Sequence, residues 1–172
     1  EVDCDEALDR ALRNLEAVIE DTGAEIVRSP LPAVEGDPSL LAALFQNVIG
    51  NAIKFRSDAA PRVEVSAGES DGEWSFRVAD NGIGIDEAYA DRVFVIFQRL
   101  HAKETYPGTG IGLALCKKIV EFHGGRIWLD TTVEQGTTVC WTLPVPVPAE
   151  PEPEPGADDE VGPSLADDLD QI

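Results

Sequence analysis

The sequence predicts an α+β fold, a two-layer sandwich in which helices cover one face of a mixed, mostly antiparallel sheet. Apolar residues recur at helical spacing in three stretches: residues 5–20, 38–55 and 112–122. Apolar and polar residues alternate, as in strands, in four further stretches: residues 63–67, 74–79, 126–131 and 137–143. The strand stretches come in neighbouring pairs joined by short turns, and hairpins and helices arranged in blocks are typical of this architecture.

Cap and turn residues mark the ends of these elements. Asp37 is suited to cap a helix that has Pro38 at its first position. Turns with glycine at residues 70–72 and 134–136 separate the strands of each pair, and Gly124 with Gly125 ends the last helix. Residues 24–28 add a short strand, whereas the glycine-rich stretch 80–112 has no clean period and predicts a long loop around a short helix.

Charge divides the chain into two parts. The chain has 172 residues with 33 acidic and 13 basic side chains, a formal net charge of −20. Residues 149–172 hold nine acidic residues and no basic one, and proline is frequent among them. We therefore expect one folded domain over residues 1–147 and a disordered acidic tail over residues 148–172. With no basic stripe to neutralise phosphates, a nucleic acid partner is not expected.

The cysteines and the hydropathy pattern bear on location. Cys4, Cys116 and Cys140 are widely spaced, which predicts neither a disulfide framework nor a zinc site and favours a reducing, cytoplasmic setting. No apolar run approaches the roughly 20 residues that span a bilayer, so direct membrane contact is not expected. The acidic start without Met predicts no signal peptide and suggests an excised fragment.

Three polar residues share one face of the helix predicted over residues 38–55. Asn47, Asn51 and Lys54 are spaced at i, i+4 and i+7, so their side chains lie one above another. Two amides and an ammonium in this arrangement could hold a metal ion and its phosphates. Taken alone, the pattern favours the simpler interpretation of a solvated helix face.

Two glycine-rich turns flank the long loop. The first is Asp80-Asn81-Gly82-Ile83-Gly84-Ile85, directly after a strand, where glycine permits a close approach to a planar ligand and Asp80 could accept from an exocyclic amine. An ordinary turn is the equal alternative. The second, at residues 108–112, opens a helix whose amides could cradle phosphate. No Gly-Lys-Ser/Thr follows, so this is not a Walker-type loop.

In combination, these elements resemble the GHKL superfamily of gyrase, the heat-shock chaperone, histidine kinases and mismatch-repair ATPases, which have the Bergerat fold. Residues 47–55 are similar to its N box, 80–85 to the G1 box, 94–97 to the F box and 108–113 to the G2 box. The resemblance covers about residues 5–143. It is strongest to sensor histidine kinases of the phytochrome-like group, and Pro107, where many kinases have Gly, fits that group.

The resemblance implies an ATP site with magnesium. Asn51 would be the magnesium ligand, Asn47 its support, and Lys54 a phosphate contact; these three would be the catalytic residues. Asp80 would bind the adenine amine, and residues 98–107 would form a lid over the nucleotide. The remaining nucleotide contacts would come from the G1 box, the lid and the G2 box: Gly82, Gly84, Ile85, Tyr106, Gly108, Thr109, Gly110, Ile111, Gly112 and Leu113.

Asn47 bears on the choice of reaction. Hydrolysing members of the superfamily have a Glu one helical turn before the magnesium Asn, and an amide cannot act as a general base at neutral pH. The sequence therefore favours transfer to a presented nucleophile over hydrolysis. A hydrolysing chaperone or topoisomerase-like ATPase is disfavoured.

The resemblance also implies partners outside this sequence. The phosphoacceptor would be a histidine on a separate dimerisation domain of a homodimer, and a response regulator would receive the phosphoryl group. His123 is expected to cap the end of its helix, and His101 to be a solvated residue of the lid, so neither is expected to be the acceptor. The alternative function is a non-catalytic interaction module that is gated by nucleotide.

Overall fold

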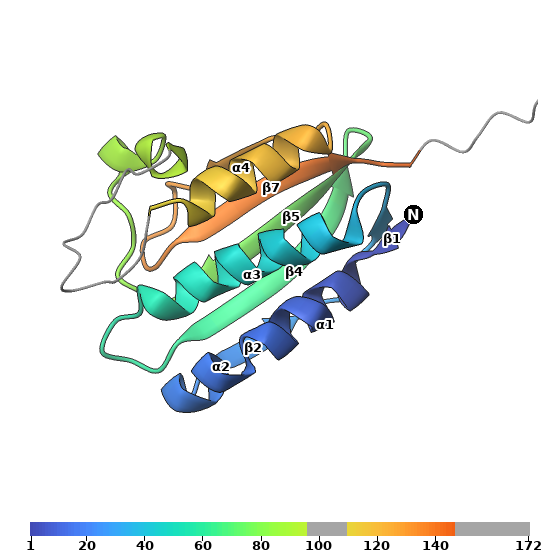
Figure 1. Ribbon diagram of the computed structural model, residues 1–172. Helices are drawn as coiled ribbons and strands as arrows, with labels where there is room; N and C mark the ends of the chain where they lie inside the picture. The colour runs from blue at the N-terminus through green and yellow to red at the C-terminus, as the bar shows by residue number, and fades with distance from the viewer. Residues whose placement is uncertain (96–109, 147–172) are drawn as a thin grey trace, which may run out of the picture.

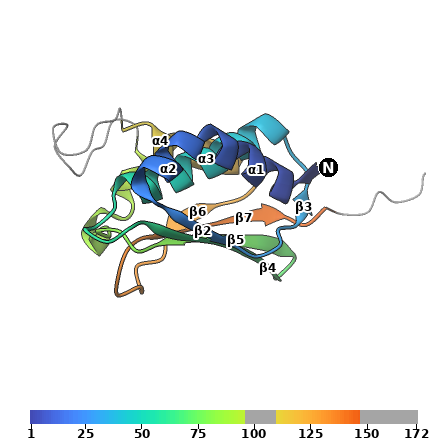
Figure 2. The same cartoon turned by 90° about the horizontal axis from the view of Figure 1, so that it is seen from below.

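The computed structural model describes residues 1–95 and 110–146 and has two layers. Figure 2 shows all the labelled helices on one side of the main sheet. The helices are α1 (Cys4–Asn14), α2 (Glu16–Thr22), α3 (Pro38–Lys54) and α4 (Gly112–Phe122). The predicted α+β sandwich is confirmed. The predicted tail, residues 148–172, lies outside the described residues. So do residues 96–109 and 147 of the predicted domain, including the predicted lid over residues 98–107.

The main sheet has five strands in the order β2-β4-β5-β7-β6. β2 pairs with β4 in parallel and every other pair is antiparallel, so the mixed, mostly antiparallel prediction is confirmed. A two-stranded sheet of β1 with β3 was not predicted, because two residues are too few to show a period. The strands are β1 (Val2–Asp3), β2 (Glu25–Arg28), β3 (Ala33–Val34), β4 (Arg62–Ser70), β5 (Glu73–Asp80), β6 (Ile127–Leu129) and β7 (Thr138–Pro144).

An aromatic cluster joins α3 to the centre of the sheet. Phe76 of β5 stacks on Trp141 of β7 with ring centroids 5.3 Å apart, and Phe45 of α3 meets Trp141 edge-on at 5.6 Å. All three side chains are fully or almost fully buried. Because burying an aromatic ring contributes several kcal/mol, on the order of 3–5 when truncation to Ala is measured, this cluster fixes α3 on the sheet.

The first helical stretch differs from the prediction of one helix over residues 5–20. The chain forms α1 and α2, with a break at Leu15, whose N–H group bonds to the carbonyls of both Ala11 and Leu12. α1 buries four side chains, whereas α2 buries none. Ile19 of α2 is partly buried against the core, so the apolar spacing continues across Leu15 and could not reveal the break.

Up to residue 95, the described part of the loop region after β5 contains two short 3₁₀ helices, Glu87–Tyr89 and Arg92–Phe94, where one short helix was predicted for the whole region. The turn between β4 and β5 is as predicted but shorter, since only Asp71 and Gly72 lie outside the strands. Both have positive φ, which suits the two-residue hairpin turn.

His123 connects the start of α3 to the end of α4. Its Nδ1 donates to the Ile119 carbonyl at 2.7 Å, and its Nε2 accepts from the Asp37 N–H group at 3.0 Å. The first bond confirms that His123 caps α4. The second was not predicted, and together the two bonds define the neutral tautomer with its proton on Nδ1.

Asp37 itself caps α3, and replacing it is expected to destabilise the domain. Its carboxylate accepts from the N–H groups of Ser39 and Leu40 at 2.8 and 2.9 Å. We predict that Asp37→Ala lowers the free energy of unfolding by about 1 kcal/mol, the usual value of an N-cap. Urea denaturation measures the change, with the exposed Asp58→Ala as control. Equal effects of the two substitutions would contradict the prediction.

Candidate functional site

The polar face of α3 meets the first residue of α4. A methyl group placed on Gly112 would lie 3.2 Å from Asn47 Oδ1 and 3.6 Å from Asn51 Nδ2. The Asn47 amide is held in place because its Nδ2 donates to the Ala43 carbonyl at 2.7 Å. Asn47 and Asn51 of the predicted N box thus lie beside Gly112 of the predicted G2 box, where α4 begins. Only a residue without a side chain fits comfortably between them.

Among the described residues, no side chain caps the start of α4. Gly110 has a φ of 73°, and Ile111 occupies the cap position without accepting from the first-turn N–H groups through its side chain. Uncapped N–H groups at a helix start attract anions. Tyr106, Gly108 and Thr109, which the sequence also assigned to the site, lie outside the described residues.

Lys54 is on the last turn of α3. Its ammonium lies 5.0 Å from the centroid of the Phe55 ring, and the side chain is half-buried. The backbone carbonyl of Phe55 in turn accepts from the Ile83 N–H group at 3.0 Å. The end of α3 therefore contacts the glycine-rich turn that follows β5.

Asp80, the last residue of β5, organises that turn. Its Oδ1 accepts from the Gly82 N–H group at 2.8 Å and from the Thr137 N–H group at 3.0 Å. Burial raises the pKa of the Asp80 carboxyl, and these two hydrogen bonds oppose the rise. One carboxylate oxygen thus joins the turn after β5 to the segment that enters β7.

Glycines allow this segment to approach closely. A methyl group on Gly136 would overlap the Asp80 carbonyl, and one on Gly82 would overlap the Phe55 carbonyl. Gly84 has a φ of 77° and lies against Gly136. Sequence reasoning assigned Gly136 only to a turn and gave Thr137 no role in the site, since neither carries site chemistry in its side chain.

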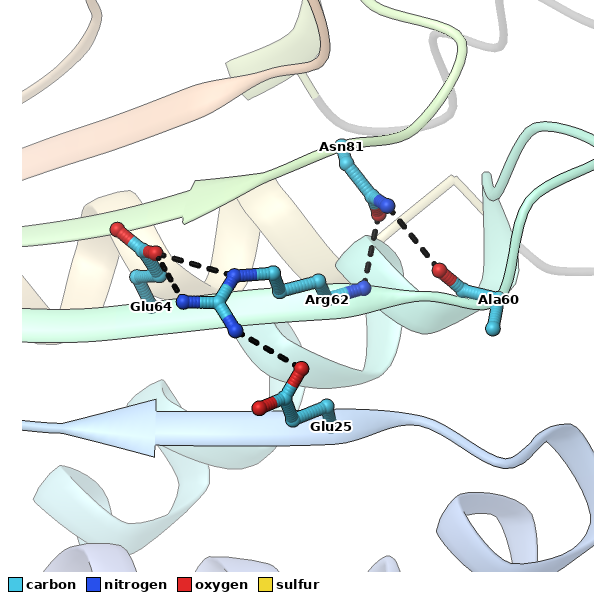
Figure 3. A network of polar contacts seen from close by, with 5 residues as sticks. All are labelled: Glu25, Ala60, Arg62, Glu64 and Asn81. Carbon is cyan, nitrogen blue, oxygen red and sulfur yellow. Dashed lines mark hydrogen bonds and ion pairs between the residues drawn. The ribbon is translucent and has the colours of Figure 1, made fainter.

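Asn81 links the turn after β5 to the start of β4, as Figure 3 shows. Its Oδ1 accepts from the Arg62 N–H group at 2.8 Å, and its Nδ2 donates to the Ala60 carbonyl at 3.0 Å. The Arg62 guanidinium pairs with Glu25 of β2 and Glu64 of β4. These exposed pairs contribute little energy individually. They tie the parallel edge strand to the base of the turn.

The described residues define a site with little charge. Among residues 1–95 and 110–146, no group of three His, Cys, Asp or Glu side chains could hold a metal ion. Ile85 and Leu113, two of the sequence-predicted site residues, are partly buried and pack against the core. In the same parts of the chain, no helix is both long and apolar enough to cross a membrane.

Comparison with known proteins gives the class. Residues 36–147 match the family model of the histidine kinase-, DNA gyrase B- and HSP90-like ATPases. The chain therefore belongs to this ATPase family, as an ATP-binding catalytic domain of the sensor histidine kinase type.

The relatives are consistent with the phytochrome-like resemblance. The chain is 53% identical over 141 residues to cyanobacterial phytochrome A of Nostoc sp., covering 82% of this chain and 18% of that protein. It is 47% identical over 143 residues to phytochrome-like protein Cph1 of Synechocystis sp., covering 83% of this chain and 19% of that protein. The chain thus spans about a fifth of the length of these relatives.

A solved structure agrees with the fold. The mycobacterial sensor histidine kinase MprB superposes with a TM-score of 0.69 at 32% identity, covering 83% of this chain and 95% of that chain. The ATP-binding domain of PrrB from Mycobacterium tuberculosis superposes with a TM-score of 0.65 at 28% identity, covering 85% and 96%.

The close packing of Gly136 can be tested against a matched glycine. Gly136 and Gly72 have φ values of 74° and 77°, but a methyl group on Gly72 would meet nothing within 4 Å. We predict that Gly72→Ala costs roughly 1–2 kcal/mol through its backbone conformation alone. Gly136→Ala is expected to cost about 1–3 kcal/mol more, because the backbone must also shift. Chemical denaturation measures both, and equal losses would refute the close approach.

The Asp80 carboxyl gives a prediction on pH. Because its pKa is raised above 3.8, the folded state keeps a proton that the unfolded state has released. Its contribution to the free energy of unfolding is thus greatest in acid and falls as pH rises through the raised pKa. We predict that Asp80→Asn gains stability relative to the unsubstituted chain as pH rises toward neutrality. Chemical denaturation at several pH values measures this difference, with Asp58→Asn as the control that should show no trend. No trend for Asp80→Asn would mean that the two hydrogen bonds fully compensate the effect of burial on the pKa.

Proposed function

We propose that this chain binds magnesium–ATP between α3, the turn after β5 and the start of α4, and donates the γ-phosphoryl group to a histidine of another domain. The observation that supports this most is the packing of Asn47 and Asn51 against Gly112 at an uncapped helix start. The amides and the helix N–H groups converge where a triphosphate needs donors and a metal ligand.

Asp80 is proposed to select adenine. Its Oδ1 accepts both backbone N–H groups, and among the described residues no donor reaches Oδ2. A carboxylate oxygen in a half-buried position suits an exocyclic amine, and the glycines at residues 82 and 84 let the turn that holds Asp80 pack closely on the backbone of Phe55 and Gly136. Asp80 would thus prefer a base with an amine over one with a carbonyl at that position.

The residues present fit magnesium. Mg²⁺ keeps several waters and takes one or two protein ligands along with substrate phosphates, so it needs no acidic cluster. The amide oxygen of Asn51, whose side chain lies near Gly112 at the start of α4, would be the ligand. When bound, the ion neutralises phosphate charge. Lys54 would add a cation from the last turn of α3.

Transfer is favoured over hydrolysis because of Asn47. Its Nδ2 already donates to Ala43, and an amide cannot remove a proton from water. In the proposed transfer, a histidine ring nitrogen forms a bond to the γ-phosphorus, the bond to the bridging oxygen breaks, and ADP leaves. The chain's own residues position and stabilise the phosphates.

The rest of the signalling route is part of this proposal. The chain spans only 18% of cyanobacterial phytochrome A, so the histidine-bearing dimerisation domain would lie in a part not present here. We propose that the whole protein acts as a homodimer in the cytoplasm and passes the phosphoryl group to a response regulator. Three free, buried cysteines are consistent with that compartment. A nucleotide-gated interaction module is the alternative if no transfer occurs.

One experiment with two measurements tests the proposal. Calorimetry with magnesium–ATP should show binding that weakens roughly tenfold or more in Asn51→Ala, because the substitution removes the amide oxygen proposed as the magnesium ligand. Asn14→Ala, another helical Asn outside the site, is the control and should bind normally. Figure 1 shows α1, which carries Asn14, on the far side of α3 from α4.

The second measurement separates the two functions. A histidine-bearing dimerisation domain of a related kinase is supplied with labelled ATP, and transfer of label to its histidine is followed. Binding with transfer supports the kinase, whereas binding without transfer to any of several such domains favours the interaction module. A folded chain that binds no nucleotide would overturn both.

A further inference from the structure

α4 has an apolar face that no part of the described structure covers. Ile111, Leu115 and Phe122 are 38%, 40% and 72% exposed. Their spacing of four and seven residues, with Lys118 between them, places them along one face of the helix. We call these four residues the outer face of α4.

Other residues of α4 already provide its core contacts. The buried ones are Ala114, Cys116, Ile119 and Val120. A surface helix normally exposes few large apolar residues, so an additional exposed set indicates a second contact. Phe122 is the strongest indication, because removing so exposed an aromatic ring from water would lower the free energy.

The charges beside the outer face favour an acidic partner. Lys117 and Lys118 are two of the chain's four lysines, and their side chains are 49% and 74% exposed. Both lie near Glu121, at 3.9 and 3.6 Å, so the group has a net positive charge. In a chain with a net charge of −20, this is a local exception.

The chain contains an acidic segment with matching spacing. Leu165, Leu169 and Ile172 fall at i, i+4 and i+7, and Asp167, Asp168 and Asp170 lie between them. Ser164 precedes this stretch with Asp167 three residues later, the pattern of a capping box. Residues 164–172 therefore have the sequence of a short acidic amphipathic helix.

This segment starts from a suitable place. β7 ends at Pro144, and a methyl group on Gly124, just beyond α4, would lie 3.5 Å from the Pro144 Cγ atom. Figure 1 shows the ends of β7 and α4 on the same side of the molecule. α4 is about 16 Å long, and the residues between 146 and 164 could extend to about 60 Å, so reach is ample.

We propose that residues 164–172 dock as an amphipathic helix on the outer face of α4. Leu165, Leu169 and Ile172 would cover Leu115 and Phe122, and the aspartates would lie beside Lys117 and Lys118. Nine residues are too few for a stable isolated helix, so folding would accompany docking. A docked segment would keep other proteins from this face, whether or not nucleotide is bound.

Paramagnetic NMR on the full chain tests the proposal. A spin label is attached through Gln171→Cys, since the three native cysteines are buried. We expect selective loss of amide signal at Leu115, Lys118 and Phe122 that is independent of protein concentration. The loss should diminish at high salt, because charge contributes to docking.

Variants define the contact. Leu165→Ser with Leu169→Ser, or Phe122→Ser alone, should restore the signals, whereas Val161→Ser, which removes an apolar residue outside the proposed stripe, should not. Phe122 is exposed, so its replacement should leave the fold intact, which the same spectra report.

Two outcomes would overturn the proposal. The first is no selective loss of signal on α4. The second is a loss that appears on isotope-labelled protein mixed with separate spin-labelled protein, which would make the occupant a second copy. No nucleotide is present, so failure here is distinguishable from failure of the ATP site.

Discussion

The candidate site depends on one carboxylate oxygen. Asp80 Oδ1 accepts from the N–H groups of Gly82 and Thr137, and so holds together two segments that are 57 residues apart in the chain. The Asp80 N–H group also donates to the Thr137 carbonyl at 2.9 Å, so backbone and side chain together anchor the turn after β5 to the entry to β7. Burial of the carboxyl group raises its pKa, and the two N–H groups that donate to Oδ1 oppose this rise.

Backbone contacts carry this constraint from strand to helix. The Phe55 carbonyl at the end of α3 accepts from Ile83, and Gly82 and Gly136 have no side chains that would separate the segments. The aromatic cluster of Phe45, Phe76 and Trp141 holds the other surface of α3 on the sheet. The polar face of α3 is thereby fixed relative to Asp80, although the residues are far apart in sequence.

The fold class, the α3 cap and the two hairpins could be predicted, because period and cap chemistry are local properties. The break at Leu15 could not, since the same apolar spacing crosses it. The N-box asparagines were identified from spacing and resemblance, but their contact with Gly112 is a long-range packing fact. Thr137 was missed because it contributes through its backbone N–H group, which every residue except proline has.

The two ends of α4 differ in their side-chain hydrogen bonds, and this difference would suit a phosphate site at its start. At its end, His123 bonds to Ile119 and to the Asp37 N–H group, so α4 is fastened to the start of α3. At its start, no side chain of residues 1–95 or 110–146 caps the first turn, and Gly112 lies against the asparagines of α3. A helix needed only for packing would gain stability from a cap there, about 1 kcal/mol. Leaving that end uncapped on a firmly held helix keeps its N–H groups available to an anion at a defined position.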